Sequence, residues 1–225
     1  MSGAAKGAIV FDLDGTLIDS AADIGQAASR VLATEGAAPL SLAETRSFIG
    51  NGARVLMARA MAARGLPEHE LPRLHQAFVA IYESAHGTTQ AYCGVAPALA
   101  DLAAKGHPLG ICTNKPAAPA RAVLAHLGLA HLFGVVIGGD SLSVTKPDPA
   151  PLHAAFAALG VPLLYVGDSE VDRDTALAAG IRFALFTEGY RKAPISDFGD
   201  ALLFSDFAAL PDLVKRLSDE ADLTH

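Results

Sequence analysis

The sequence has few cysteines and no long apolar run, and these absences exclude several classes of protein. Its two cysteines, Cys93 and Cys112, have neither a Cys-x-x-Cys nor a Cys/His spacing, so we predict neither a disulfide framework nor a zinc site. No apolar stretch approaches the roughly 18 residues that a membrane-spanning helix requires. The N-terminal sequence MSGAAKGAIVFDLDG has no features of a targeting signal. We therefore expect a cytoplasmic protein with no membrane partner.

The sequence also lacks an excess of positive charge. Lysine and arginine number 17 against 24 aspartates and glutamates, which gives a formal net charge of -7. Because a field of this sign repels polyanions, we expect no nucleic-acid partner, and an anionic substrate must be captured locally. Apolar residues, in contrast, make up 51% of the 225 residues, which is enough to bury a substantial core.

What the sequence does contain is an alternation of short apolar strands with Ala-rich and Leu-rich helical segments. The strands are predicted at residues 7–11, 108–112, 135–137, 163–166 and 181–186. Between them, helices are predicted at residues 95–105, 119–127, 151–159 and 171–179. This alternation is typical of an α/β fold, and it predicts a Rossmann-like core with a mostly parallel sheet.

The segment after the first strand breaks this alternation. It has helical spacing, and candidate helices lie at residues 22–35, 52–64 and 68–83, separated by glycines. We interpret it as an α-helical cap inserted into the core. The predicted domains are a catalytic core of residues 1–18 and 92–225 and a helical cap of residues 19–91.

Polar side chains follow the predicted strands at the points where the strands end. They are Asp12 and Asp14 after AIVF, Thr113 and Asn114 after LGIC, Lys146 downstream of VVIGG, and Asp168 after LLYVG. Open parallel sheets bind ligands at the carboxyl ends of their strands, so we expect these residues to converge on one crevice.

The residue types at this crevice suit the hydrolysis of a phosphate ester. Asp12 could attack phosphorus and form an aspartyl-phosphate, which divides one difficult hydrolysis into two easier steps. Mg²⁺ prefers oxygen ligands, and Asp12 and Asp168 could supply two of them beside the substrate phosphate. Lys146 would act as a fixed cation on the phosphate. Asp14 could protonate the leaving oxygen and later deprotonate the hydrolytic water.

Three further residues have candidate roles near these groups. Thr113 and Asn114 offer a hydroxyl and backbone N–H groups to the transferring phosphoryl oxygens, so both are candidate substrate-binding residues and Thr113 is also a candidate catalytic residue. Asp172 lies four residues after Asp168 at the opening of a helix. It could orient a metal-bound water, or it could serve as a favourable acid in the first helical turn.

These motifs carry a family resemblance. The sequence resembles the phosphatase branch of the haloacid dehalogenase superfamily in FDLDGTLIDS (11–20), CTNK (112–115), TKPDP (145–149) and YVGDSEVD (165–172). The resemblance implies Asp12 as nucleophile, Asp14 as acid and base, and Lys146 as electrostatic clamp. It also implies magnesium on Asp12, on Asp168 and on the backbone carbonyl of Asp14.

The resemblance extends to the predicted cap and to the substrate. An acid at Asp14 favours ester hydrolysis over dehalogenation, and FIGNGARVLMARA (48–60) is similar to the cap of the phosphoglycolate phosphatase group. The favoured substrate is therefore a small phosphorylated metabolite, 2-phosphoglycolate. Gly50 could let backbone donors approach it, and Arg54 or Arg46 could pair with its carboxylate.

Other functions remain compatible with the sequence. Within enzymes, the alternatives are a phosphosugar phosphatase and a phosphosugar mutase. A noncatalytic regulatory protein on the same scaffold is a further alternative, because a fold does not determine a function. The sequence leaves the oligomeric state open.

Overall fold

The predicted apolar strands lie side by side in one sheet. The computed structural model describes residues 6–83 and 87–222. Within them the sheet has six strands in the order β5-β4-β1-β6-β7-β8, and all neighbouring strands are parallel. Their bounds are β1 Ala8–Phe11, β4 Leu109–Cys112, β5 Val135–Ile137, β6 Pro162–Gly167, β7 Phe183–Phe186 and β8 Leu202–Phe204. The predicted α/β fold with a Rossmann-like sheet is confirmed.

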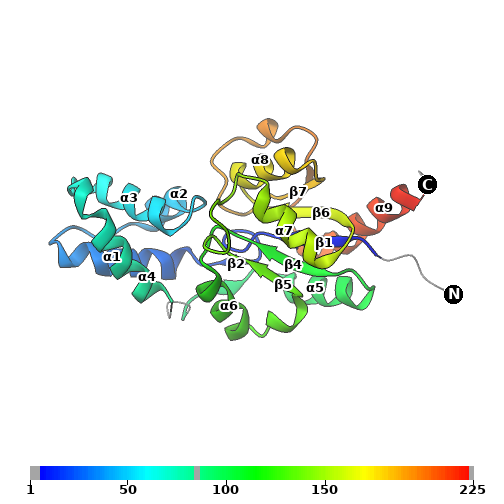
Figure 1. Ribbon diagram of the computed structural model, residues 1–225, viewed down its shortest axis with the longest axis horizontal. Helices are drawn as coiled ribbons and strands as arrows, with labels where there is room; N and C mark the ends of the chain where they lie inside the picture. Colours follow the sequence, from blue (N-terminus) through cyan, green and yellow to red (C-terminus); the bar gives the residue numbers. More distant parts are fainter. Residues whose placement is uncertain (1–5, 84–86, 223–225) are drawn as a thin grey trace.

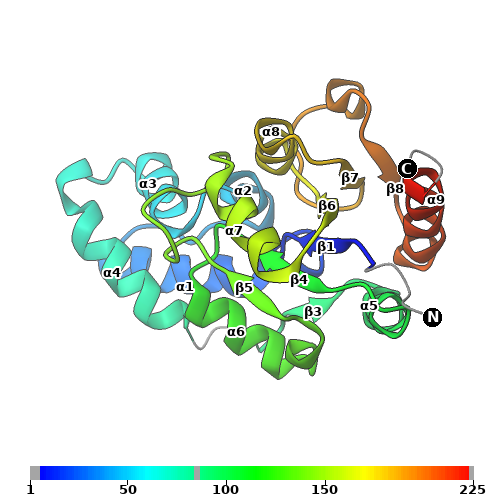
Figure 2. The ribbon, with the colours of Figure 1, turned by 45° about the vertical axis from the view of Figure 1, so that its right-hand side comes forward.

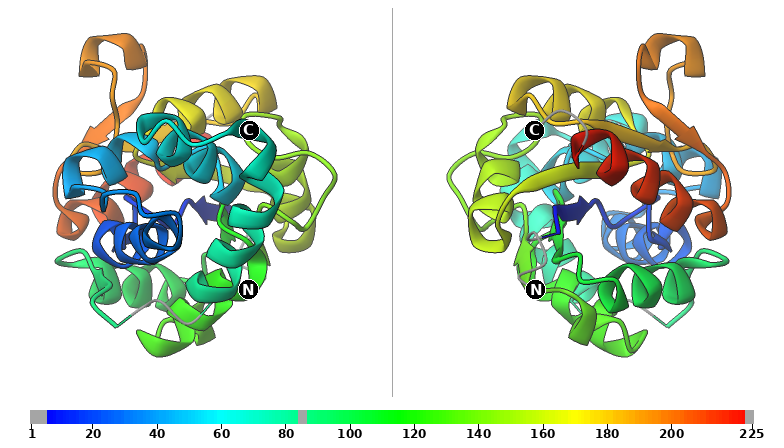
Figure 3. Two further views of the ribbon diagram at one scale, coloured as in Figure 1. Left: turned by 90° about the vertical axis from the view of Figure 1, so that its left-hand side faces the viewer. Right: turned by 90° about the vertical axis from the view of Figure 1, so that its right-hand side faces the viewer.

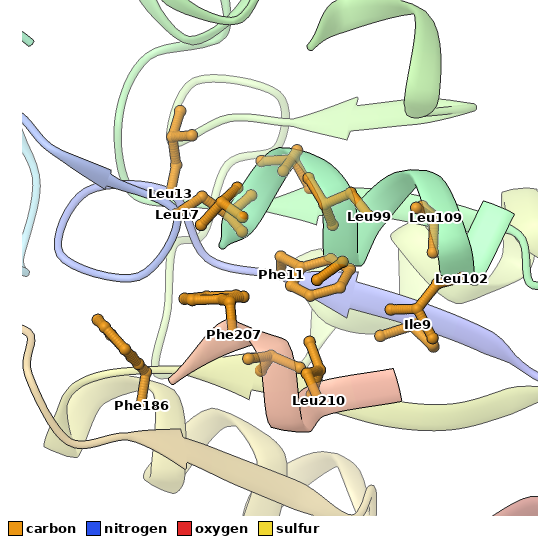
Figure 4. Close-up of a cluster of buried hydrophobic side chains, with 14 of the residues drawn as sticks. Ile9, Phe11, Leu13, Leu17, Leu99, Leu102, Leu109, Phe186, Phe207 and Leu210 are labelled. Atoms are coloured by element: carbon orange, nitrogen blue, oxygen red, sulfur yellow. The ribbon is translucent and has the colours of Figure 1, made fainter. Parts of the chain in front are cut away.

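Helices cover both faces of this sheet, since parallel strands need crossover connections. These helices are α5 Val95–Ala104, α6 Ala117–His126, α7 Ala150–Leu159, α8 Glu170–Ala179 and α9 Leu210–Asp222. Side chains of β1 alternate between the faces: Ile9 and Phe11 belong to the apolar cluster with α5 and α9, and Ala8 and Val10 to the cluster with α7 and α8. Figure 4 shows Ile9 and Phe11 in one cluster with Leu210 of α9. The core therefore has an apolar layer on each side of β1.

A second group of helices lies beyond the sheet, at one end of the molecule (Figures 1 and 3). They are α1 Ala21–Thr34, α2 Leu42–Phe48, α3 Ala53–Ala63 and α4 Leu71–Tyr82. These helices enclose their own apolar cluster, which includes Met57, Leu74 and Phe78. An inserted helical unit is thus present, as the predicted fold requires. The sequence-based predictions missed α2, which begins with a capping box between Ser41 and Glu44.

The chain enters and leaves α1–α4 through two short strands that pair with each other. β2 (Ile18–Asp19) and β3 (Gln90–Ala91) form an antiparallel pair. The remaining elements are short 3₁₀ turns at Glu68–Glu70, Ala130–Leu132, Ile195–Phe198 and Phe207–Ala209. Among the described residues, no helix combines the length and the apolar character that crossing a membrane requires.

Some of the sequence considered above is not described. Residues 1–5, 84–86 and 223–225 lie outside the described residues, and they include the start of the N-terminal sequence and part of the predicted cap (19–91).

Candidate active site

The candidate site lies beside β1, the strand from which the sheet extends in both directions. From β1 the sheet grows to one side through β4 and β5 and to the other through β6, β7 and β8, and Figure 2 shows β1 between β4 and β6. Such switch points leave a crevice at the carboxyl ends of the strands. Asp12, Thr113 and Asp168 follow β1, β4 and β6, and all three side chains are buried there.

A buried lysine joins the loops after these strands. Lys146 Nζ lies 2.8 Å from Asp12 Oδ1 and 2.6 Å from Asp172 Oδ1, and it donates a hydrogen bond of 2.8 Å to the Tyr165 hydroxyl. Burial by itself lowers the pKa of Lys146, but the charges of Asp12 and Asp172 outweigh it and raise this pKa. The Lys146 ammonium therefore stays charged and is held beside Asp12.

Three carboxylates share this small volume. Oxygens of Asp12, Asp168 and Asp172 lie within 4.8 Å of one another. Burial raises the pKa of Asp12 to about 6 against the attraction of Lys146. Burial, and then repulsion by Asp172 and Asp12, raise the pKa of Asp168 well above its usual range. Crowded carboxylate oxygens are the ligands that Mg²⁺ prefers, and a divalent cation would relieve their repulsion, so the residues present fit this ion.

Asp168 is oriented by its neighbours. Thr16 Oγ1 donates to its Oδ1 at 2.8 Å, and the backbone N–H of Tyr190 donates to its Oδ2 at 2.5 Å. Gly15, at a φ of 91°, is needed here: a Cβ on it would lie 2.5 Å from Asp168 Oδ2. Gly15 and Thr16 thus bring the loop after β1 close to the loop after β6.

Asp172 takes the position of an acid in the first turn of α8, one of the two roles that the sequence left open, and it also contacts Lys146. Its Oδ2 accepts from Ser169 Oγ at 2.7 Å and from the Ser169 backbone at 3.1 Å, which caps α8. Its Oδ1 holds Lys146. Burial raises the pKa of Asp172, but the charge of Lys146 and the hydrogen bonds that Asp172 accepts together outweigh burial and lower this pKa. Asp172 therefore positions the lysine and the start of α8 together, and it also lies in the carboxylate cluster.

Asp14 faces the boundary between the sheet and the helices α1–α4. Its Oδ1 accepts from Ser20 Oγ at 2.6 Å, and Lys115 Nζ lies 3.1 Å from the same oxygen. The Lys115 ammonium also contacts the hydroxyl of Tyr82 at the end of α4. Asp14 thus lies at the meeting point of the two groups of helices.

Asn114 uses its side-chain amide to connect loops. Its Oδ1 accepts from the Lys146 backbone N–H, and its Nδ2 donates to the carbonyls of Lys146 and Gly50, each at 3.0 Å. Thr113 Oγ1 accepts from the Lys115 backbone N–H at 3.2 Å. Asn114 therefore positions Lys146 and ties the sheet to Gly50.

A small cavity opens between the sheet and α1–α4. It is lined by Asp12, Asp14, Ile24, Ile49, Gly50, Gly52, Ala53, Leu56, Phe78, Tyr82, Thr113, Asn114, Lys115 and Pro116. Gly50, a candidate substrate-binding residue, is among these lining residues. Arg54 is exposed and is not among these lining residues, and Arg46 is exposed and paired with Asp19 at 2.9 Å. The structure does not bring either arginine into the cavity.

Several residues of the site carried weak signals or none. Lys115 and Thr16 lie inside the quoted motifs, so their positions could have been flagged from the sequence. Tyr165 also begins a quoted motif, YVGDSEVD, although it lies in β6. Tyr82 and Tyr190 come from segments without a motif, and their contacts arise from packing.

Comparison with known proteins gives consistent matches. The family model described as haloacid dehalogenase-like hydrolase matches residues 9–186. The phosphoglycolate phosphatase of Cereibacter sphaeroides (strain ATCC 17029 / ATH 2.4.9) is 53% identical over 213 residues, which cover 93% of this chain and 98% of that protein. The phosphoglycolate phosphatase of Rhodobacter capsulatus is 45% identical, with coverage of 92% and 96%.

Solved structures of related proteins also match this chain. A predicted phosphoglycolate phosphatase from Haemophilus somnus 129pt matches with a TM-score of 0.87 and 31% identity, covering 94% of this chain and 99% of that one. CbbY from Rhodobacter sphaeroides, solved in complex with phosphate, matches with a TM-score of 0.74 and 25% identity, covering 91% and 96%.

Proposed function

Because this chain belongs to the haloacid dehalogenase-like hydrolase family, we propose that it is a Mg²⁺-dependent phosphatase that hydrolyses 2-phosphoglycolate to glycolate and phosphate. The observation that carries the proposal is the contact of 2.8 Å between Asp12 and the buried Lys146 beside two further carboxylates. The name of the relatives at 53% and 45% identity supports the choice of substrate.

In the first step, a carboxylate oxygen of Asp12 attacks phosphorus and the bond from phosphorus to the ester oxygen breaks. The product is an aspartyl-phosphate on Asp12 and a glycolate oxygen that must take up a proton. Lys146, fixed by Asp172 and Tyr165, keeps a positive charge beside the reacting oxygens as negative charge develops on them.

Asp14 supplies the proton to the leaving oxygen. In the second step it takes a proton from water, which attacks phosphorus and releases phosphate from Asp12. The side chain of Asp14 lines the same cavity as Asp12, and Ser20 and Lys115 fix its orientation.

Magnesium would be held by Asp12, Asp168 and the backbone carbonyl of Asp14, where it would neutralise charge on the phosphate and the nucleophile. Thr113 would offer its hydroxyl to the phosphoryl oxygens, and Gly50 would bring backbone at the start of α3 close to the substrate. Asn114 would act through the backbone of Lys146.

The helices α1–α4 would form a cap over this site. We assign residues 19–91 to the cap and residues 1–18 and 92–225 to the catalytic core, because β2 and β3 connect the two parts and the cap has its own apolar cluster. Closure of such a cap excludes bulk water from the reaction. A cytoplasmic location stays a prediction from the N-terminal sequence.

The test is phosphate release from 2-phosphoglycolate and from hexose and pentose phosphates, with and without Mg²⁺. We expect a preference for 2-phosphoglycolate that requires the metal. Asp12→Asn should lower turnover by roughly 10³-fold or more, since it removes the nucleophile and retains the shape of the side chain.

Other outcomes would identify other functions. A preference for sugar phosphates would retain the chemistry and replace the substrate. An isomerised sugar phosphate without net release of phosphate would identify a mutase. No Asp12-dependent release from any ester would favour a regulatory protein.

A further inference from the structure

Lys115 is a buried lysine to which the proposed chemistry assigns no reacting role. Its side chain is only 4% exposed, and Nζ lies 3.1 Å from Asp14 Oδ1. The ammonium also lies 4.1 Å from the ring centroid of Tyr82 and contacts the hydroxyl of that residue. Since an ammonium is costly to bury without partners, these contacts are needed to hold the Lys115 side chain at the cavity.

The balance of charge in the cavity makes Lys115 distinctive. Among the described residues that line the cavity, it is the single basic residue, beside the carboxyl groups of Asp12 and Asp14. Lys146 is already paired with Asp12 and Asp172. A substrate that carries a carboxylate as well as a phosphate brings a second anionic group, and that group needs a second cation.

The position of Lys115 matches the position of such a carboxylate. Asp14 is the proposed proton donor to the ester oxygen, so that oxygen must lie within hydrogen-bond distance of Asp14. In 2-phosphoglycolate one carbon separates the ester oxygen from the carboxylate, which therefore also lies close to Asp14. Lys115 Nζ occupies this neighbourhood, and its three N–H donors can be shared among Asp14, Tyr82 and the substrate.

We propose that the Lys115 ammonium binds the carboxylate of the substrate, and that the site thereby selects phosphate esters of 2-hydroxy acids. The inference rests on the proposed phosphatase function and specifies how its substrate is recognised. It assigns to Lys115 the carboxylate pairing that the sequence suggested for Arg54 or Arg46.

The apolar part of the cavity wall supports this selection. The side chains of Ile24, Leu56 and Phe78, from α1, α3 and α4, are apolar and offer no partners for the hydroxyls of a sugar. A buried hydroxyl without a hydrogen bond is unfavourable, so this wall favours a short acid over a phosphosugar. The N-terminal ends of α3 and α6, at Ala53 and Pro116, also line the cavity and add positive potential.

The experiment compares kcat/KM for 2-phosphoglycolate with that for 2-hydroxyethyl phosphate, which carries a hydroxyl in place of the carboxylate. In Lys115→Met we expect the ratio of the two values to fall roughly 10- to 100-fold, mainly through 2-phosphoglycolate. Lys115→Arg, which keeps the charge, should retain most of the preference. A merely structural role would lower both values by the same factor and leave the ratio unchanged, which would overturn the inference.

Two matched variants test rival cations. Lys192 lines the neighbouring pocket beside Asp168, and its Nζ donates to the Ile49 carbonyl at 3.3 Å. Arg54 is exposed on α3. If the ratio of the two kcat/KM values falls in Lys192→Met or Arg54→Met and is unchanged in Lys115→Met, Lys115 is not the residue that binds the carboxylate.

A measurement on the wild-type protein remains decisive if Lys115→Met does not fold. The phosphate ester of 3-hydroxypropanoate places the carboxylate one carbon farther from the ester oxygen, and we expect its kcat/KM to be lower by roughly tenfold or more. Equal values for the two acids would contradict the selection of 2-hydroxy acids. Release of no phosphate from any ester would instead contradict the proposed function itself, and the inference would fall with it.

Discussion

Asn114 shows how a single side chain positions the reacting groups. Its amide makes three hydrogen bonds of 3.0 Å, two to the backbone of Lys146 and one to the carbonyl of Gly50. In Asn114→Ala these backbone groups lose their partners inside the protein. We expect the free energy of unfolding to fall by about 1–3 kcal/mol. We also expect kcat to fall roughly 10- to 100-fold, because Lys146 is less well fixed.

Urea unfolding and steady-state kinetics on 2-phosphoglycolate measure the two effects. Asn51→Ala is the matched control, because the Asn51 side chain accepts from Arg59 within the cap at 2.9 Å and does not line the cavity. A kcat of Asn114→Ala equal to that of the control would show that Asn114 does not position Lys146.

For single residues, the sequence predicts those site residues that directly follow the carboxyl end of a strand. Asp12 and Asp168 were identified because each follows an apolar strand whose carboxyl end must meet its neighbours. Lys115 and Tyr82 were not given roles, because their contact joins segments 33 residues apart and depends on how α4 packs. Motifs report local spacing, whereas this contact is set by tertiary structure.

Between elements, Asp23 holds the start of α1 to the segment that returns from the cap. Its carboxylate accepts from the backbone N–H and the hydroxyl of both Thr88 and Thr89, at 2.6–3.2 Å. Asp23→Asn presents an amide to some of these donors. We expect it to lower the free energy of unfolding by about 1.5–3 kcal/mol at neutral pH.

The pH dependence of this effect has a defined sign. Burial raises the pKa of Asp23, but the hydrogen bonds from Thr89 and Thr88 outweigh it and lower this pKa below its usual 3.8. The stabilisation is therefore complete above about pH 4 and is lost as the pH falls through the lower, folded pKa. The difference between wild type and Asp23→Asn in urea unfolding should shrink as the medium becomes more acidic. A constant difference would show that the charge of Asp23 is not the cause.

The elements themselves were predictable where an apolar pattern is complete. The strand at Val135–Ile137 agrees with the prediction, and α7 differs from it by one residue at its start. α2 was missed because it has only 7 residues, too few to establish a helical period, and the three-residue strand β8 was missed as well. In α9, Pro211 and the charged residues near the end obscured a helix whose apolar face packs on the sheet.

For the molecule as a whole, the sequence indicated a parallel sheet but not its order. The order β5-β4-β1-β6-β7-β8 places β1 in the middle, because the chain builds outward on one side and then on the other. That choice depends on which apolar faces meet, as in the cluster joining Phe11 to Phe207, which lies far along the chain. It also determines that the loops after β1, β4 and β6 converge.

This convergence links metal binding to the stability of the whole fold. Asp12, Asp168 and Asp172 place three carboxylates around one buried ammonium, that of Lys146, and burial raises the pKa of Asp12 to about 6 against the attraction of that ammonium. A cation that binds the folded state alone stabilises it, by about 2.7 kcal/mol at a concentration 100 times its Kd. For a chain of this length that corresponds to a rise in Tm of about 5–11 °C.

Thermal unfolding with and without Mg²⁺ measures this rise without reference to catalysis. In Asp168→Asn we expect a higher Tm than wild type in the absence of metal, because one buried like charge is removed. The increment on adding Mg²⁺ should be small in this variant, because a ligand is lost. Since Asp168 follows β6 and Asp12 follows β1, the cation would hold neighbouring strand ends together. A Tm of the wild type that does not change with Mg²⁺, or an equal increment in both proteins, would exclude the carboxylate cluster as the metal site.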